Sequence, residues 1–426
     1  MASFFIPLTG LQSDSVALNT IANNLANIST TGYKASTTKF SDLFYENLGT
    51  TGSGDPVQLG SGVQVASNST SYTSGSISST SNDTDMALNG EGFFVVQNND
   101  GTNEYTRAGD FSLSSTGVLE TSSGSSVMGY PATDGVVNTS SALSAITIPV
   151  GQTLTPKATS TLSMTTNLDS SASTGDTYPA EATVYDSLGD SHTLTVTYTK
   201  TGTNTWSYSA ELPASDYTSG TSTAVTGTLT FDSSGTLTSI TPSSGSTTTV
   251  GTASGDSSSI SLGFSGLADG ASDLSIKWNL LGSSDTPTVS QVDSTSTLSA
   301  STQDGYSSGT YESFSVASDG TVSATYSNGK TQDIGQLAVA TVANEQGLTR
   351  LGDGNYQTTN ASGTASIGTA DNGGRASVED DALEGSNVDI STQFSELIIA
   401  QRAFEANSKA VTTFDTVIGD TISLIR

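Results

Sequence analysis

The sequence predicts a multidomain protein in which all-β middle domains, antiparallel and sandwich-like or barrel-like, lie between N- and C-terminal α-helices that pair as a coiled coil. Two periodicities predict this class. Apolar residues recur at intervals of three and four near both ends, whereas between the ends they alternate with polar residues. The length of 426 residues is also more than one compact core usually spans. We therefore expect two or more domains.

The first expected element is an N-terminal helix within residues 1–30. Its apolar residues share one helical face, and a threonine-rich segment that contains Gly32 follows them. Because glycine readily adopts the left-handed conformation that terminates many helices, Gly32 is expected to mark the end of this element. The residues expected on the apolar face, as part of an assembly interface, are Leu11, Leu18, Ile21, Leu25 and Ile28.

Three asparagines of this helix, Asn19, Asn23 and Asn27, are spaced four apart and form a polar row. Two interpretations have similar weight. The row is either a solvated face, or a set of uncharged hydrogen-bonding groups that meet neighbouring subunits, where burying charge would be costly. The second interpretation places the three asparagines in the assembly interface.

The last expected element is a long helix within residues 386–426, in which apolar residues recur every seven positions, as in a coiled coil. Ser386 or Asn387 is the expected N-cap, with Asp389 in the first turn. A helix of about forty residues is about 60 Å long, more than a small β-domain covers. This helix is expected to pair with the N-terminal helix, and much of its apolar side is expected to be buried against other chains or to stay disordered until they arrive. The assembly residues expected on it are Ile390, Leu397, Phe404, Val411, Phe414, Ile418 and Ile425.

Between the helices, the segment "SHTLTVTYTKTGTNTWSYSAEL" alternates apolar and polar residues on both sides of a glycine-containing turn, which predicts a hairpin with one buried face. The segments "FFVVQNNDGTNEYTR", "TGTLTFDSSGTLTSI" and "FSVASDGTVSATYSNG" predict further hairpins. Residues of roughly 75 to 365 are therefore expected to be all-β.

The composition excludes several functions. Twelve basic and forty-one acidic residues give a net charge of −29, which would repel nucleic acid and an anionic membrane surface. The longest apolar runs are too short for membrane insertion, and the start "MASFFIPLTG" lacks the basic and long apolar regions of a cleaved signal peptide. The absence of cysteine excludes disulfides and thiol chemistry.

Catalytic chemistry has little support. The single histidine, His192, is in phase with neighbouring apolar strand residues, so the prediction is a strand residue that faces a partly buried surface. The acidic groups around Asp83 and Asp85 lack the ligand spacing of a calcium loop, and Asp380 and Asp381 are expected in a solvated loop. We expect no catalytic, cofactor-binding or metal-binding residues and no cofactor.

Both ends resemble one protein family. The segment "LNTIANNLANISTTGYK" resembles the N-terminal signature of bacterial flagellar rod and hook proteins, and "EGSNVDISTQFSELIIAQRAFEANSKAVTTFDTVI" resembles their C-terminal signature. "DMALNGEGFFVV" is similar to a segment shared by rod and hook proteins. "VYDSLGDSHTLTVTYTKTGTNTW" and "YSNGKTQDIGQLAVATVANEQGLTRLGDGNYQTT" resemble the hook members in particular.

This resemblance implies a structural subunit without catalysis, which self-assembles into a helical homopolymer. That polymer is a curved tube outside the cell, the hook, which joins rod to filament as a universal joint and transmits motor torque. The implied partners are other copies of the chain, the rod and hook–filament junction proteins, the hook cap protein and the flagellar type III export apparatus. Export would occur without cleavage of a signal peptide.

The resemblance also suggests a domain division, with terminal helices forming an inner coiled-coil layer and β-domains forming outer layers. Two other functions stay open at this point. One is a distal rod or hook–filament junction protein of the same family, and the other is a secreted β-rich adhesin, which would not need matched helical ends. The expected segments are a helix at 1–30, an extended linker at 31–74, an inner β-domain at 75–149 and 287–365, an inserted outer β-domain at 150–286, a linker at 366–385 and a helix at 386–426.

Overall fold

The computed structural model describes residues 5–243, 248–249, 259–282 and 286–424. The chain forms two compact units. Unit 1 contains residues 1–150, 312–325 and 331–426, and unit 2 contains residues 151–311 and 326–330. Both terminal helices belong to unit 1, and unit 2 is built from strands, so the predicted fold class is confirmed. No helix in the described part of the chain is long and apolar enough to cross a membrane.

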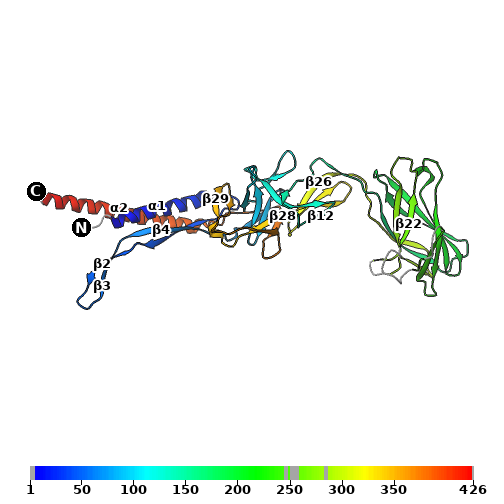
Figure 1. Cartoon of the computed structure of the whole chain (residues 1–426), viewed down its shortest axis with the longest axis horizontal. Coiled ribbons are helices and arrows are strands. Elements are labelled where there is room, and N and C mark those ends of the chain that lie inside the picture. Colours follow the sequence, from blue (N-terminus) through cyan, green and yellow to red (C-terminus); the bar gives the residue numbers. More distant parts are fainter. Residues whose placement is uncertain (1–4, 244–247, 250–258, 283–285, 425–426) are drawn as a thin grey trace. The chain divides into compact units, whose positions relative to one another are not determined.

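The two helices of unit 1 are α1 (Phe5–Ala26) and α2 (Ile390–Leu424), and they lie side by side (Figure 1). Helix α1 ends six residues before Gly32, which has the expected left-handed conformation with φ of 65°. The expected N-cap of α2 is wrong. Asp389 caps the helix, because its Oδ1 accepts a hydrogen bond from the Thr392 N–H (2.8 Å), whereas Asn387 accepts one from the Ala35 N–H (2.7 Å).

The β-body of unit 1 is an antiparallel sheet with the central order β27-β28-β11-β7-β8-β30-β29. The predicted hairpin at "FFVVQNNDGTNEYTR" is β7 with β8, so that prediction is confirmed. Phe93 packs against Tyr356 in its core, with ring centroids 5.5 Å apart. The strands are β7 (Phe93–Gln97), β8 (Asn103–Thr106), β11 (Ser126–Thr133), β27 (Thr321–Tyr326), β28 (Thr331–Thr341), β29 (Thr349–Gly352) and β30 (Asn355–Gln357), with β9 (Ser112–Leu113), β10 (Leu119–Glu120), β12 (Val136–Val137), β13 (Ser144–Ala145) and β31 (Ser366–Thr369) at its sides.

Short ladders occupy the segments 31–74 and 366–385, which the sequence analysis described as linkers. Their serine- and glycine-rich composition gave no clear strand signal. The pairs are β1 (Ser36–Asp42) with β4 (Val63–Thr70), β2 (Tyr45–Thr50) with β3 (Pro56–Gly60), β5 (Ile77–Ser79) with β33 (Ala382–Glu384), and β6 (Met86–Asn89) with β32 (Ser377–Asp380).

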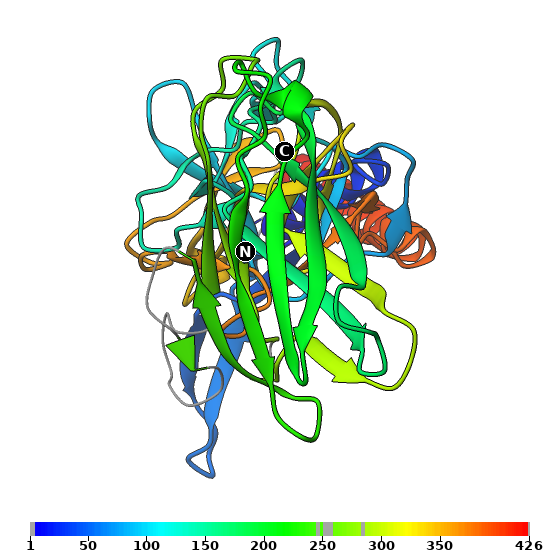
Figure 2. The same ribbon diagram turned by 90° about the vertical axis from the view of Figure 1, so that its right-hand side faces the viewer.

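Unit 2 contains a six-stranded sheet, whose long strands face the viewer in Figure 2, and a five-stranded sheet. The predicted hairpins at "SHTLTVTYTKTGTNTWSYSAEL" and "TGTLTFDSSGTLTSI" are confirmed as β17 with β18 and β19 with β20. The first sheet comprises β16 (Thr177–Tyr185), β17 (Ser191–Gly202), β18 (Thr205–Glu211), β19 (Val225–Phe231), β20 (Leu237–Pro242) and β21 (Thr248–Thr249). The second comprises β15 (Thr161–Asp169), β22 (Ser259–Phe264), β23 (Leu274–Asn279), β24 (Val289–Val292) and β25 (Thr297–Gln303).

The two sheets of unit 2 share one buried core. Tyr208 of the six-stranded sheet meets Trp278 of the five-stranded sheet with ring centroids 5.7 Å apart, in an edge-to-face arrangement. Most strand pairs are antiparallel, and β15 adds parallel pairings to β23 and β24. Strands β24 and β25 therefore belong to unit 2, although residues 287–311 were assigned to the inner β-domain from sequence. The remaining strands are β14 (Thr153–Leu154) of unit 2 and β26 (Gly309–Val316), of which residues 309–311 belong to unit 2 and residues 312–316 to unit 1.

Candidate assembly surface

The two terminal helices run antiparallel, as the polar contacts between them show. Near the end of α1, the Asn24 side-chain amide donates a hydrogen bond to Gln393 Oε1 (2.9 Å) at the start of α2. Nearer the beginning of α1, Asp14 accepts a hydrogen bond from the amide of Asn407 (2.9 Å). Segments from opposite ends of the sequence therefore pack along much of the length of α1.

The apolar residues predicted for the helical interface are brought together only in part. On α1, Ile21 is buried, and on α2 Leu397, Val411 and Phe414 are half-buried. These residues therefore lie at least partly on the covered side of the helix pair. Phe404 and Ile418 each keep 38% of their surface exposed, and Ile390 keeps 51%. Ile425 lies outside the described residues. The other predicted residues near the N-terminus are half-buried: Leu11, Leu18 and Leu25 lie on α1, and Ile28 lies just after its end.

The predicted asparagine row lies at the margin of the helix pair. Asn19 and Asn23 are exposed, and Asn27 is half-buried. The amide of Asn27 donates a hydrogen bond to the Asn23 backbone carbonyl (2.8 Å), and the amide of Asn23 donates to Tyr33 Oη (3.3 Å). The described contacts of this row are local, so a role in binding neighbouring subunits stays a prediction.

A fourth asparagine, Asn24, is the polar centre of the helix pair, and the sequence analysis missed it. Its side chain is 1% exposed. Besides binding Gln393, it donates a hydrogen bond to the Ser36 carbonyl (2.7 Å) and accepts one from the Ser36 N–H (3.0 Å). This asparagine thus ties α1 to α2 and to the first residue of β1. The signal was its position three residues after Ile21, on the apolar face.

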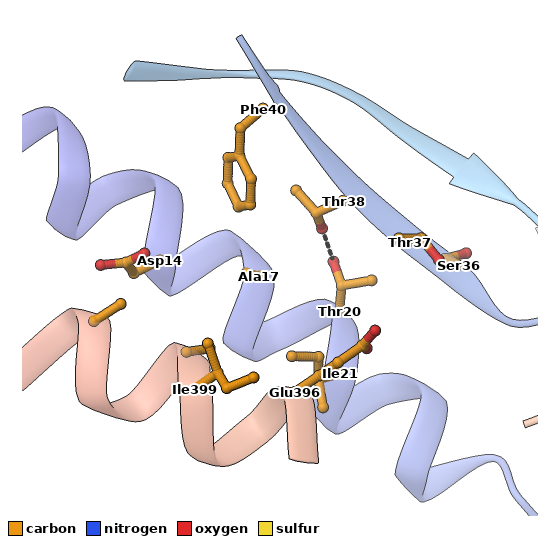
Figure 3. Close-up of a pocket in the computed structure, with 12 residues that line it drawn as sticks. Asp14, Ala17, Thr20, Ile21, Ser36, Thr37, Thr38, Phe40, Glu396 and Ile399 are labelled. Carbon is orange, nitrogen blue, oxygen red and sulfur yellow. Dashed lines mark hydrogen bonds between the residues drawn. The ribbon is translucent and has the colours of Figure 1, made fainter. Parts of the chain in front are cut away.

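A cavity of about 250 Å³ lies where α1, α2 and β1 meet (Figure 3). Ile399, which is 69% exposed, borders it together with Phe40 of β1. The Thr38 hydroxyl donates a hydrogen bond to Thr20 Oγ1 (2.9 Å), which holds β1 beside α1. The cavity is therefore a mainly apolar notch in the helix pair, lined by Asp14, Ala17, Thr20, Ile21, Ser36, Thr37, Thr38, Phe40, Glu396, Ile399, Ala400 and Ala403.

A second apolar row of α2 is formed by Ile390, Phe394 and Ile398, which are spaced four residues apart; we call these three residues the outward row. Phe394 is 48% exposed and Ile398 is 58% exposed. Residues with this spacing form one continuous stripe on a helix, and α1 does not bury it. Of these three residues only Ile390 was predicted from the sequence, because the seven-residue repeat lies on another face of the helix. The four-residue repeat was the available signal.

The junction between the helices and the β-body contains a buried charged network. Glu384 is fully buried and forms salt bridges with Lys34 Nζ (2.6 Å) and with Arg107 Nη1 (3.1 Å). It also accepts a hydrogen bond from the Gly75 N–H (2.7 Å). Burial lowers the pKa of Lys34, against the opposing effect of its hydrogen bond to Glu384. Four separate segments of unit 1 meet at this one carboxylate.

Gly32 is required beside this network for steric reasons. Its N–H donates a hydrogen bond to the Glu384 carbonyl (2.8 Å), and a Cβ atom at this position would lie 2.6 Å from the Arg107 carbonyl carbon. Together with its positive φ, this close approach favours glycine. The Thr31-Gly32 pair of the sequence therefore turns the chain from α1 into the β-body.

Comparisons with known proteins cover both units. Four protein families match: Flagella basal body rod protein at residues 8–34, Flagellar hook protein FlgE/F/G D1 domain at 87–166, Flagellar basal body protein FlaE D2 domain at 151–306, and Flagellar basal body rod FlgEFG protein C-terminal at 379–424.

Full-length relatives are also found. The chain is 33% identical to the flagellar hook protein FlgE of Treponema pallidum, over 100% of both chains. It is 32% identical to the flagellar hook protein FlgE of Escherichia coli, over 99% of this chain and 100% of the relative. Among solved structures, the Helicobacter pylori flagellar hook protein FlgE2 has a similar fold, with a TM-score of 0.55, 16% identity and coverage of 72% of this chain and 100% of that chain.

Proposed function

Since the chain belongs to the family of flagellar hook proteins named FlgE and is a structural subunit of the flagellar hook, we propose that it polymerises through the exposed apolar faces of its terminal helices. Membership of this family implies self-polymerisation in the hook. The observation that carries the more specific proposal is the outward row, which leaves large apolar side chains in water in the single chain.

The outward row would gain free energy if a neighbouring subunit covered it. Burying apolar surface contributes about 25 cal/mol per Å², so each of these side chains contributes on the order of 1–2 kcal/mol when a neighbouring subunit covers it. The middle of α2 instead exposes the charged residues Arg402 and Glu405, which pair with each other (3.0 Å) and are well hydrated. The outward row is therefore a stronger candidate for subunit contact than this charged middle stretch.

The same proposal gives the notch beside Ile399 and the asparagine row a role. The notch is apolar and open, so a side chain of a neighbouring copy would fill it. Asn19, Asn23 and Asn27 would bind the neighbouring copy by hydrogen bonds, without the cost of burying a charge. These contacts would form the wall of the polymer.

We further propose the properties of the polymer and its partners, because the full-length relatives are flagellar hook proteins. The polymer is a curved, flexible tube outside the cell, which connects rod to filament and transmits torque for swimming. Its subunits pass through the flagellar type III export apparatus without cleavage of a signal peptide and assemble under a cap protein. The two ends of the tube bind the rod and the hook–filament junction proteins. A distal rod or junction role is not favoured, because the full-length relatives are hook proteins.

The proposed assembly surface is tested by Ile398→Asp in the outward row. The charge should block polymerisation, because it would have to be buried between subunits without a partner. The free chain should keep its structure, since Ile398 is already 58% exposed. Electron microscopy of polymerised protein and motility of a complemented deletion strain measure the first effect, and circular dichroism measures the second.

The matched control is Thr412→Asp, which places the same charge at an exposed position of α2 outside the outward row. This variant should assemble more fully than Ile398→Asp. Tubes of normal yield and length from Ile398→Asp would show that the outward row does not contact neighbouring subunits.

A further inference from the structure

A compact group of ligand-type side chains lies in unit 2, away from the helices. His192 is on β17, Asp186 is in the turn that precedes this strand, and Asp269 is in the loop that precedes β23. The His192 Nε2 atom lies 3.1 Å from Asp186 Oδ2 and 3.6 Å from Asp269 Oδ2. The three candidate ligand atoms all lie within 4.8 Å of one another. Three separate segments thus direct one nitrogen and two oxygens to one point.

Backbone hydrogen bonds hold both carboxylates in this orientation. Asp186 is fully buried, and its Oδ1 accepts hydrogen bonds from the N–H groups of Leu188 (2.8 Å), Gly189 (2.8 Å) and Asp190 (3.0 Å). The backbone N–H of Ala271 donates to Asp269 Oδ1 (2.9 Å). In each carboxylate, Oδ1 is engaged by the backbone and Oδ2 faces His192. The donor atoms are therefore preorganised.

A third carboxylate orients the imidazole from the other side. Asp216 Oδ2 lies 2.8 Å from His192 Nδ1. A carboxylate at this position favours a proton on Nδ1, which leaves the Nε2 lone pair directed at the two Oδ2 atoms. Three electron-rich atoms at these distances repel one another unless positive charge lies between them. In the described part of the chain, the salt bridges of these three aspartates all go to His192.

The distances fit the coordination shell of a small divalent metal ion. Zinc binds nitrogen and oxygen ligands at about 2.0–2.2 Å in a tetrahedral arrangement, so that neighbouring ligand atoms lie about 3.3–3.5 Å apart. The two separations from His192 Nε2, 3.1 and 3.6 Å, lie on either side of this range. The Asp269 side chain is 20% exposed, so water can reach one side of the group. A mixed imidazole and carboxylate set is typical of divalent transition metals.

We propose that Asp186, His192 and Asp269 bind one divalent transition-metal ion, of which Zn²⁺ fits best, with water in the open position. Asp216 is a positioning residue that acts through the imidazole. The ion would connect the six-stranded sheet, which carries His192, to the loop that leads into the five-stranded sheet. It would therefore stabilise unit 2 by binding the folded state in preference to the unfolded state.

The sequence predicted no metal site, because the single histidine has no histidine partner and its acidic neighbours are distributed along the chain. The alternative is a purely protonic arrangement, in which a charged imidazolium lies among the carboxylates and no metal binds. The two readings differ in an observable property. A metal ion occupies Nε2 in the first, whereas a proton occupies it in the second.

The composition of the chain allows a direct test with the untagged, full-length protein. It contains one histidine and two tryptophans, and both tryptophans lie in the buried core of unit 2. After dialysis against a chelator, Zn²⁺ should bind with one ion per chain in calorimetry. It should also move the Nε2 resonance of the imidazole to a metal-bound position in ¹⁵N NMR. The thermal midpoint of unit 2, followed by tryptophan fluorescence, should rise.

Three variants sharpen the test. Asp269→Asn removes a partly exposed ligand and should abolish stoichiometric Zn²⁺ binding, whereas Asp273→Asn, an exposed aspartate outside the group, should bind as the unchanged protein does. Asp216→Asn should weaken binding by about 10–100-fold without eliminating it, because it removes only an orienting partner.

Two results would overturn the proposal. One is an Nε2 atom that stays protonated at saturating Zn²⁺, and the other is equal Zn²⁺ affinity in Asp269→Asn and the unchanged protein. Either result would support the imidazolium arrangement. Neither would affect the assembly proposal, which rests on residues of unit 1.

Discussion

The terminal helices and unit 2 differ in how much of their large apolar side chains they expose. Unit 2 buries Trp206 and Trp278 to 1% and 0% exposure, and among the large apolar residues of its described part only Leu188 and Val292 are prominently exposed. Helix α2 exposes Phe394 by 48%, and seven further large apolar residues are also prominently exposed along its described length. Unit 2 therefore buries its large apolar side chains within its own chain, whereas the helices leave many of theirs exposed to water.

This difference follows from how apolar residues are arranged along the strands and along the helices. The alternation in unit 2 places apolar residues on the inner faces of two sheets that belong to the same chain. The helices have apolar residues on more than one face, and one partner helix covers only one of them. We infer that unit 2 is stable as a single copy and that the helical region gains much of its stability from neighbouring copies.

The largest expected effect tests the self-sufficiency of unit 2. Trp278→Ala should lower its free energy of unfolding by about 3–5 kcal/mol, because a large cavity replaces a side chain that contacts Tyr198 and Tyr208. Urea unfolding, followed by the fluorescence of the remaining Trp206, measures this loss. Leu188→Ala, at a position that is 56% exposed, is the control and should change little. Equal midpoints for both variants would mean that this core does not stabilise unit 2.

The second effect concerns the charged network of unit 1. Glu384→Gln removes the anionic partner of buried Lys34 and Arg107, and breaking a buried ion pair in this way costs about 3–5 kcal/mol. The loss should appear in the thermal transition of the helices by far-ultraviolet circular dichroism, whereas the tryptophan transition of unit 2 should not move.

Glu405→Gln is the control for this network, because its salt bridge with Arg402 is largely exposed and contributes little. A shift of the tryptophan transition in Glu384→Gln as large as that of the helices would contradict the separation of the two units.

A smaller effect is expected within the helix pair. Asn24→Ala leaves the buried groups of Ser36 and Gln393 without their partner, which costs about 2–3 kcal/mol. Amide exchange of α1 in the free chain should accelerate accordingly. Asn19→Ala, at an exposed position of the same helix, should leave this exchange unchanged. Equal exchange in both variants would show that Asn24 does not hold α1 in place.

The smallest effect concerns Asp304 of unit 2. Burial raises its pKa, but hydrogen bonds from the Ser160 hydroxyl and from the Thr161 and Ser160 N–H groups, together with Lys157, outweigh burial and hold it well below its ordinary value of 3.8. A lowered folded-state pKa stabilises the protein above pH 3.8, and this stabilisation is lost as the pH falls through the folded-state value. Asp304→Asn should therefore lower stability by about 1 kcal/mol at neutral pH.

The pH dependence provides the measurement for Asp304. The difference in tryptophan-detected stability between Asp304→Asn and the unchanged protein should shrink as the pH falls below 3.8, because the carboxylate becomes protonated. A difference that stays constant with pH would show that the charge of Asp304 is not what stabilises this part of unit 2.

Residues close together in the sequence were the easiest to place. The seven-residue repeat predicted α2, and turn chemistry predicted hairpins such as β17 with β18. Asn24 and the outward row were not predicted, because periodicity alone was the available guide. Periodicity shows which residues share a helical face, but it does not show which of two apolar faces a partner will cover.

The sequence by itself determined the class of each segment, because helical and strand periodicities and glycine at Gly32 depend on backbone geometry within a few residues. Only the tertiary structure decided which distant groups meet. Tertiary packing brings Glu384 to Lys34 and His192 to Asp269. The local sequence pattern around each of these residues does not indicate its partner. The physical reason is that charge and ligand geometry depend on distances in space, which a one-dimensional pattern does not specify.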